Sequence, residues 1–163
     1  MINELVLKIP PRLLEKKRHS GFTLFELMLV VAIVAVLAMI GIPYYQNYRD
    51  QMNINKAETD IAAIEGFVQH YWEENRNYPD FLTDAGVNMI DPWGNPYKYF
   101  NIETAKGKGM LRKDKSLNPI NSDYDLYSMG KDGQSQTPLT APVSHDDIIR
   151  ARNGQFVGLA SDF

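Results

Sequence analysis

The sequence predicts an α+β protein in which one long N-terminal helix packs on a small antiparallel β-sheet. An uncharged apolar run of 19 residues, 27–45, leads directly into a stretch whose apolar residues recur with helical spacing. Strand-like alternation begins only after residue 75, between turns rich in Gly, Pro, Asn and Asp. The simplest way to bury both patterns is to pack the helix stripe on one sheet. The 163 residues suffice for one modest domain and a membrane anchor.

The first half of the predicted helix, residues 22–45, is expected to span a membrane. At about 1.5 Å per residue, a helix over residues 27–45 has a length of about 30 Å, which matches the thickness of a bilayer's hydrocarbon core. Residues 1–21 contain five Lys or Arg, whereas residues 45–64 contain only two, Arg49 and Lys56. Because Lys and Arg favour the cytoplasmic side, we expect a single-pass protein with its N-terminus inside and its C-terminal domain outside. No Ala-x-Ala cleavage site follows the run, so the segment should be retained.

The second half of the helix follows an interruption at Gly41-Ile42-Pro43. Proline removes a backbone hydrogen bond, so we expect a kink there, and the alternative is that the helix ends. Apolar residues then recur at alternating steps of three and four, which indicates one amphipathic helix. This stripe consists of Ile54, Ala57, Ile61, Ile64, Val68 and Tyr71. We therefore predict one helix over residues 22–74, ended by the segment before Pro79.

Residues 75–163 are predicted to form a globular domain outside the membrane. A short helical turn is expected near residues 79–86, and strands are expected at residues 97–102, 110–112 and 123–129. The closing stretch 155–163 is expected either to add an edge strand or to cover the domain. The chain has no cysteine, so no disulfide can cross-link this domain.

Composition and motifs exclude several classes of function. Of the 17 basic and 20 acidic residues, five and two respectively lie in residues 1–21, which leaves the remainder with a net charge of −6. That balance argues against nucleic acid as the main partner. The sequence contains no nucleophile elbow, phosphate loop, zinc pattern or catalytic pair, so we expect no enzymatic activity. The alternative from another class is a single-pass membrane enzyme with an external domain.

The start of the apolar run carries the first resemblance. Gly21-Phe22-Thr23-Leu24-Phe25-Glu26, with Lys16-Lys17-Arg18 before it, resembles the type III signal of type IV pilins and type II secretion pseudopilins. The resemblance implies that prepilin peptidase, a membrane aspartic protease, cuts between Gly21 and Phe22 and so removes the cytoplasmic leader 1–21. It implies that the same enzyme then N-methylates Phe22. It also implies that Glu26, a costly carboxylate in a spanning segment, neutralises the amino group of Phe22 on a neighbouring subunit. The alternative is that Glu26 snorkels to the membrane interface.

Two later stretches resemble the major pseudopilin. Asp91-Pro92-Trp93-Gly94-Asn95-Pro96-Tyr97 is similar to its turn before the first strand, and we expect a tight turn with an aromatic anchor. The stretch 123–133, together with Asp146-Asp147-Ile148, resembles its calcium loop, although the twelve residues 134–145 make this loop longer.

Calcium is the cofactor that the second of these resemblances implies. It would bind the carboxylates of Asp132 and Asp146, the backbone oxygen of Met129 and, as a further ligand, Asp147. Calcium takes 6–8 oxygen ligands, often carboxylates mixed with backbone carbonyls. The alternative is that Asp132-Gly133 forms an ordinary turn and that Asp146 or Asp147 caps a helix over residues 148–152.

Together these resemblances imply a pseudopilin of the type II secretion system in the bacterial inner membrane, with its C-terminal domain in the periplasm. Such a subunit self-associates into a helical filament that drives protein secretion. Its expected partners are minor pseudopilins, the inner-membrane assembly platform and prepilin peptidase. The alternative is a major or minor type IV pilin in adhesion, motility or DNA uptake. The absence of cysteine and the presence of the stretch 132–148 favour the pseudopilin.

Overall fold

The computed structural model describes residues 21–104 and 108–163. Helix α1 runs from Leu24 to Asn75, so it begins two residues later and ends one residue later than the sequence predicts. It continues through Pro43, and the alternative in which the helix ends there is therefore wrong. The basic cluster before Gly21, and the leader as far as residue 20, lie outside the described residues.

The chain divides after Ile42 into two units. In the first unit, the large apolar side chains of α1 are exposed, for example Leu24, Leu37 and Ile40. Within the described part of the chain, α1 is the one helix long and apolar enough to cross a membrane. An apolar helix with exposed side chains is expected to meet lipid or sister helices.

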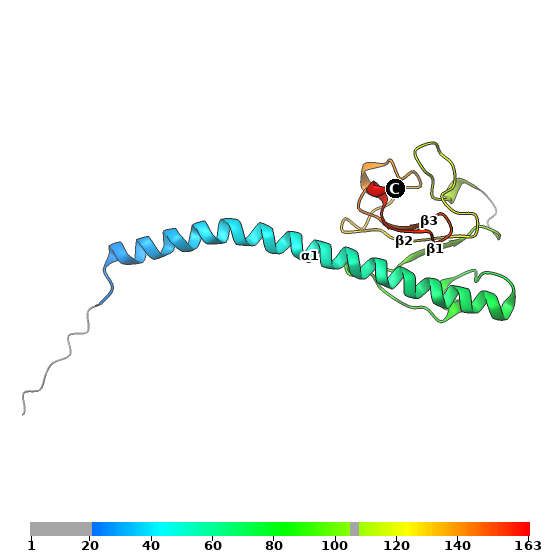
Figure 1. Ribbon diagram of the computed structural model, residues 1–163, viewed down its shortest axis with the longest axis horizontal. Helices are drawn as coiled ribbons and strands as arrows, with labels where there is room; N and C mark the ends of the chain where they lie inside the picture. Colours follow the sequence, from blue (N-terminus) through cyan, green and yellow to red (C-terminus); the bar gives the residue numbers. More distant parts are fainter. Residues whose placement is uncertain (1–20, 105–107) are drawn as a thin grey trace, which may run out of the picture. The chain divides into compact units, whose positions relative to one another are not determined.

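The second unit contains a four-stranded antiparallel sheet with the strand order β1-β2-β3-β4 (Figure 1). Its strands are β1 Lys98–Asn101, β2 Tyr124–Ser128, β3 Ile148–Ala151 and β4 Phe156–Leu159. Lys98 pairs with Tyr127, and Tyr127 pairs in turn with Ile149. The predicted α+β fold is confirmed. The strands predicted at residues 97–102 and 123–129 are present as β1 and β2, and the predicted helical turn forms at Leu82–Ala85.

Two details of the prediction need correction. Residues 110–112 form no strand: a short 3-10 helix occupies Lys108–Met110, and Lys113 bridges only to Pro119 and Pro138. The chain turns between Lys113 and Pro119, where Leu117 N donates to the Asp114 carbonyl, so this bridge cannot extend into a longer hairpin. The alternative helix at residues 148–152 is also wrong, because β3 lies there between β2 and β4. The closing stretch does add an edge strand, β4.

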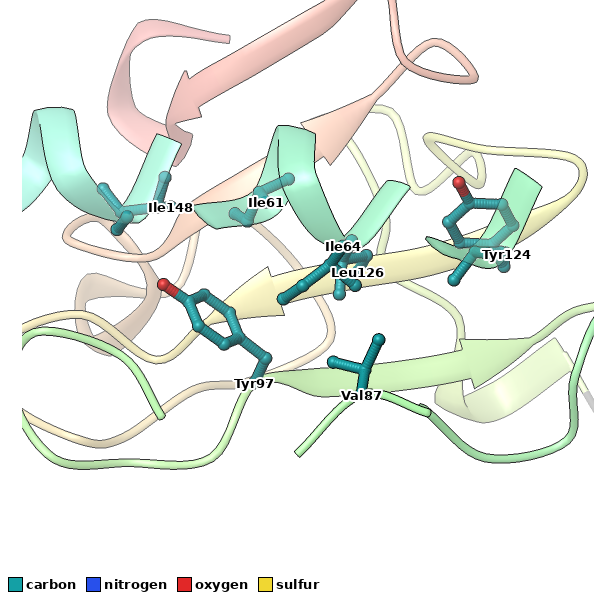
Figure 2. Packing of buried hydrophobic residues seen from close by; sticks show 9 residues of the cluster. Ile61, Ile64, Val87, Tyr97, Tyr124, Leu126 and Ile148 are labelled. Carbon is teal, nitrogen blue, oxygen red and sulfur yellow. The ribbon is translucent and has the colours of Figure 1, made fainter. Parts of the chain in front are cut away.

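The main core lies between the second half of α1 and one face of the sheet, as Figure 2 shows. Ile61 and Ile64 of α1 are fully buried against Tyr124, Leu126 and Ile148. A second, smaller cluster contains Ile120, Leu139, Ile149, Ala151 and Ala160. Successive residues of a strand face opposite sides of a sheet, which is why Ile148 joins the first cluster and Ile149 the second. The helix therefore covers one face of the sheet, and loops cover the other.

A buried arginine also ties α1 to the sheet. Arg150 of β3 donates from Nε to Glu65 Oε1 of α1 at 2.9 Å and from Nη2 to Asp123 Oδ2 at 2.7 Å. Its guanidinium lies 4.0 Å from the centroid of the Tyr124 ring. The stripe on α1 is thus fixed in register by one charged contact as well as by apolar packing.

Candidate functional site

The predicted cleavage point lies in accessible, non-helical chain. Gly21, Phe22 and Thr23 precede the first turn of α1, and Phe22 is 86% exposed. No described side chain approaches the position that a Cβ of Gly21 would occupy. The bond between Gly21 and Phe22 therefore lies outside the helix and is accessible.

Thr23 and Glu26 form a reciprocal capping box at the start of α1. Thr23 donates to Glu26 Oε2 from both its backbone N and its Oγ1, each at 2.9 Å. In return, the backbone N of Glu26 donates to Thr23 Oγ1 at 3.2 Å. A capping box satisfies N–H groups that have no partner inside the helix, and this one also gives the Glu26 carboxylate two donors. The sequence carries the signal for it, a Thr followed three residues later by Glu, although we predicted no role for Thr23.

The two predicted calcium ligands Asp132 and Asp146 lie side by side although 14 positions separate them. The backbone N of Asp132 donates to Asp146 Oδ2 at 3.0 Å. Gly130, at a φ of +62°, packs so closely that a Cβ there would lie 2.2 Å from the carbonyl oxygen of Asp146. Only glycine fits both the conformation and the space. The loop after β2 is therefore closed on Asp146.

Asp147 is occupied by other partners. Its carboxylate forms a buried ion pair with Arg112 and accepts a hydrogen bond from Ser135 Oγ at 2.7 Å. Burial raises the pKa of Asp147 to about 6, against the opposing effect of the Arg112 charge. Its second oxygen, Oδ1, is buried and has no hydrogen-bond partner among the described residues. The structure thus brings Asp132 and Asp146 together and places the Asp147 carboxylate in a different contact.

Asp132 and Asp146 suit only a cation that also binds backbone carbonyl oxygens. Across residues 21–104 and 108–163, no group of three or more His, Cys, Asp or Glu side chains is arranged to hold a metal. Asp132 Oδ1 accepts from the backbone N of Gln134 at 2.7 Å, and Asp146 Oδ2 accepts from the backbone N of Asp132. Any calcium bound here would therefore need backbone carbonyls and water besides these two carboxylates, which are ligands that calcium takes. A zinc-like site that depends on side chains alone does not fit these residues.

The aromatic turn supports the same loop. Asp91 Oδ1 accepts from the backbone N of Trp93 and of Asn95, and Asp91 Oδ2 accepts from Ser128 Oγ at 2.6 Å. The backbone N of Gly130 donates to Ser128 Oγ at 3.1 Å, so the turn is linked to the loop that begins at Gly130. The predicted aromatic anchor is also present, because Tyr97 donates to Asp60 of α1 at 3.1 Å.

Comparisons with known proteins agree with these features. Residues 16–42 match the family model of the prokaryotic N-terminal methylation motif. The chain is 33% identical over 138 residues to type II secretion system core protein G of Klebsiella pneumoniae, which covers 81% of this chain and 94% of that relative. It is 30% identical over 145 residues to the protein of the same name from Pseudomonas aeruginosa, covering 74% of this chain and 89% of the relative.

A pilin is also among the similar proteins. The chain is 33% identical over 100 residues to type IV major pilin protein PilA of Myxococcus xanthus, which covers 61% of this chain and 44% of that pilin. No solved structure matches the chain. The similarity to core protein G thus extends over nearly the whole relative, whereas the similarity to the pilin covers less than half of it.

Proposed function

The chain belongs to the type II secretion system core protein G family, and from this premise we propose that it is a pseudopilin, the structural subunit of a periplasmic filament that drives protein secretion. The observation that carries the proposal is the methylation motif over residues 16–42, in which an accessible Gly21-Phe22 bond precedes a capped, apolar helix. The function is structural rather than enzymatic. The helices form the filament core, and an ATPase elsewhere supplies the work of extraction.

The processing chemistry follows from the start of α1. Prepilin peptidase cuts between Gly21 and Phe22 and methylates the new amino group of Phe22. Glu26 is then the fifth residue of the mature chain, and its carboxylate neutralises that amino group on the neighbouring subunit. Thr23 is the internal partner that holds the carboxylate until then. Removing one partner of an ion pair in a low-dielectric medium is costly, so this pair can fix the register between subunits.

The proposed location is the bacterial inner membrane, crossed once, with the N-terminus in the cytoplasm and residues 46–163 in the periplasm. The charge asymmetry around the apolar run supports this orientation. The further partners are minor pseudopilins and the inner-membrane assembly platform.

Calcium is proposed as a structural ligand of the loop after β2. Asp132 and Asp146 would hold it, together with the backbone oxygen of Met129, and Asp147 is left to its ion pair with Arg112. When bound, calcium would neutralise the two acids and cross-link the two ends of the loop. This chain's own contribution is the close packing of Gly130 on Asp146, which brings the Asp146 carboxylate to the backbone N of Asp132.

Intact-mass analysis of the chain extracted from membranes tests the function. We expect loss of residues 1–21 and one added methyl group on Phe22, and cross-linking should trap oligomers of the processed chain. Gly21→Leu should block cleavage, whereas the control Gly41→Leu, within the helix, should be cleaved normally. A mature N-terminus beyond Tyr44 would indicate ordinary secretory cleavage and contradict the proposal.

The alternative function is a type IV pilus subunit, which the similarity to the Myxococcus xanthus pilin favours. The two are distinguished by deleting the gene: loss of secreted proteins from the medium supports the pseudopilin, whereas loss of surface fibres with normal secretion supports the pilin.

A further inference from the structure

A polar hollow of about 510 Å³ lies in the second unit, on the part of α1 that follows the apolar run. Three separate segments meet there: the helix, the aromatic turn and the loop after β2. An ion pair joins two of them, because Lys131 Nζ lies 2.6 Å from Asp50 Oδ2. The lining of the hollow includes Gln46, Arg49, Asp50, Asn53, Trp93 and Lys131.

The charges of the lining favour an anion. Lys131 already neutralises Asp50, whereas Arg49 takes part in no ion pair with any described residue. One positive charge is therefore left uncompensated. The amide side chains of Gln46 and Asn53 add hydrogen-bond donors beside it, and the indole of Trp93 adds an apolar surface. A guanidinium with neighbouring amides matches the oxygens of a phosphate group.

Chain connectivity places Gln46 and Arg49, the first residues of the hollow on α1, at the edge of a membrane. Gln46 directly follows the charge-free run 27–45. At about 1.5 Å per residue, Gln46 to Arg49 extend about 6 Å beyond it, and the polar layer of a bilayer is roughly 5–7 Å thick on each side. Tyr44, Tyr45 and Tyr48 are 77%, 62% and 59% exposed at the same level. Exposed aromatic residues at the end of a span are typical of the interfacial belt.

We infer that this hollow binds the phosphate-bearing headgroup of an anionic phospholipid in the leaflet from which α1 emerges. Arg49 contacts the phosphate, Gln46 donates to headgroup oxygens, and the Trp93 ring lies beside the headgroup. The inference rests on the proposed membrane anchoring. It gives Trp93 and Lys131 a use in the unassembled subunit, whose extraction into a filament must break this contact.

The test uses the full chain, diluted in vesicles of phosphatidylcholine with added phosphatidylglycerol. The chain has two tryptophans, so Trp72→Phe leaves Trp93 as the one tryptophan emitter. Quenching of Trp93 by headgroup-spin-labelled phosphatidylglycerol and phosphatidylcholine gives the preference of the hollow for the anionic lipid. We expect a clear preference for phosphatidylglycerol, which Arg49→Gln lowers about fivefold, the effect of one basic residue at an anionic surface.

Lys115→Gln is the matched control. It removes the same charge from an exposed residue that does not line the hollow, and it should leave the preference unchanged. Arg49 is itself exposed, so Arg49→Gln is expected to fold normally.

Three results would overturn the inference. They are equal quenching by the two lipids, an unchanged preference in Arg49→Gln, and loss of the preference in low-millimolar inorganic phosphate, which would indicate a general anion site. Leader cleavage and cross-linking of the Arg49→Gln chain are also measured in cells. These measurements distinguish an error in the lipid-binding inference from an error in the proposed pseudopilin function. A processed, assembled chain without lipid preference refutes the lipid site alone, whereas an uncleaved chain that keeps the preference refutes the pseudopilin function alone.

Discussion

The guanidinium of Arg112 and the carboxylate of Asp147 form an ion pair in which the two side chains are only 2% and 0% exposed. The same guanidinium donates to Ser135 Oγ and to the carbonyl of Gln136, and it lies 4.4 Å from the centroid of the Tyr127 ring. Arg112 therefore contacts both ends of the stretch between Gln134 and Asp147. In a domain without cysteine, this buried pair closes the long loop.

Breaking the Arg112–Asp147 pair should destabilise the domain strongly. Arg112→Met leaves a buried carboxylate without its cation and should lower the free energy of unfolding by about 3–5 kcal/mol. The double variant Arg112→Met with Asp147→Leu should recover much of that loss, because apolar replacement of both partners removes the unpaired charge. Urea unfolding of residues 46–163 measures both effects.

The ion pair between the exposed Lys56 and the largely buried Asp60 provides the control for that experiment, because Asp60 keeps its hydrogen bond from Tyr97 when Lys56 is replaced. Lys56 is 61% exposed, so Lys56→Met should change the free energy of unfolding by less than about 1 kcal/mol. An effect of Arg112→Met no larger than that of Lys56→Met would show that the buried pair does not hold the loop.

Calcium should raise the melting temperature of the same fragment. A ligand at a hundredfold excess over its Kd stabilises the folded state by about 2.7 kcal/mol. Each kcal/mol is worth roughly 4–8 °C, so the fragment should melt about 10 °C or more higher in calcium than in chelator. Asp132→Ala should abolish most of this difference, and magnesium should substitute poorly.

Asp114→Ala is the matched control for Asp132→Ala. Asp114 also accepts from backbone N–H groups in a turn, at 2.8 Å from both Ser116 and Asn118, but it lies outside the proposed loop. It should therefore leave the calcium effect intact. Identical melting curves in calcium and chelator for the unmodified fragment would remove the metal and leave the loop to the Arg112 pair.

Thr23 and Glu26 should affect insertion and assembly differently. Glu26→Ala removes a carboxylate from the spanning segment, so membrane insertion should improve while filament assembly fails, because Phe22 loses its partner. Thr23→Val removes the hydroxyl of the capping box, so the Glu26 carboxylate loses one of its two donors and keeps only the backbone N of residue 23. Membrane insertion should therefore become less efficient. Alkaline extraction reports insertion, and cross-linking reports assembly.

Thr59→Val is the control, since its hydroxyl also donates within α1, to the Asn55 carbonyl, but outside the apolar run. Normal filaments from Glu26→Ala would exclude the proposed ion pair from the mechanism.

Stability should fall at alkaline pH because the buried tyrosines must stay protonated. Burial, reinforced by the negative charge of Asp60, raises the pKa of Tyr97 well above its ordinary value. Above about pH 10 the unfolded chain releases this proton and the folded domain keeps it, so the folded state is destabilised by up to about 1.4 kcal/mol per pH unit for each such group. Below that pH the contribution is complete.

Tyr97→Phe isolates one of these groups. It should cost about 0.5–1.5 kcal/mol at pH 8, through loss of the hydrogen bond to Asp60, yet weaken the decline between pH 10 and 11. Tyr48→Phe, at a residue that is 59% exposed, should change neither value. Urea unfolding at both pH values makes the comparison, and an undiminished decline in Tyr97→Phe would contradict the assignment.

The sequence by itself determined the elements whose signals are local. Helix α1 could be read from residues three and four apart, and β1 and β2 from alternation along single segments. The motif from Gly21 to Glu26 is contiguous, and even the Thr23 capping box was readable from a spacing of three. Each of these signals depends on residues that lie within a few positions of one another in the sequence.

Tertiary structure decided the rest. All four residues of β3 are buried, so Ile148–Ala151 shows no alternation, and its strand form depends on β2 and β4 on either side. Asp147 resembled a metal ligand beside Asp146, yet its partner is Arg112, 35 positions earlier. Successive side chains near a strand take different directions, so adjacent carboxylates can enter different environments. Whether Asp146 or Asp147 meets the buried Arg112 depends on contacts between segments that are distant in the sequence. These contacts exist only once the sheet has formed.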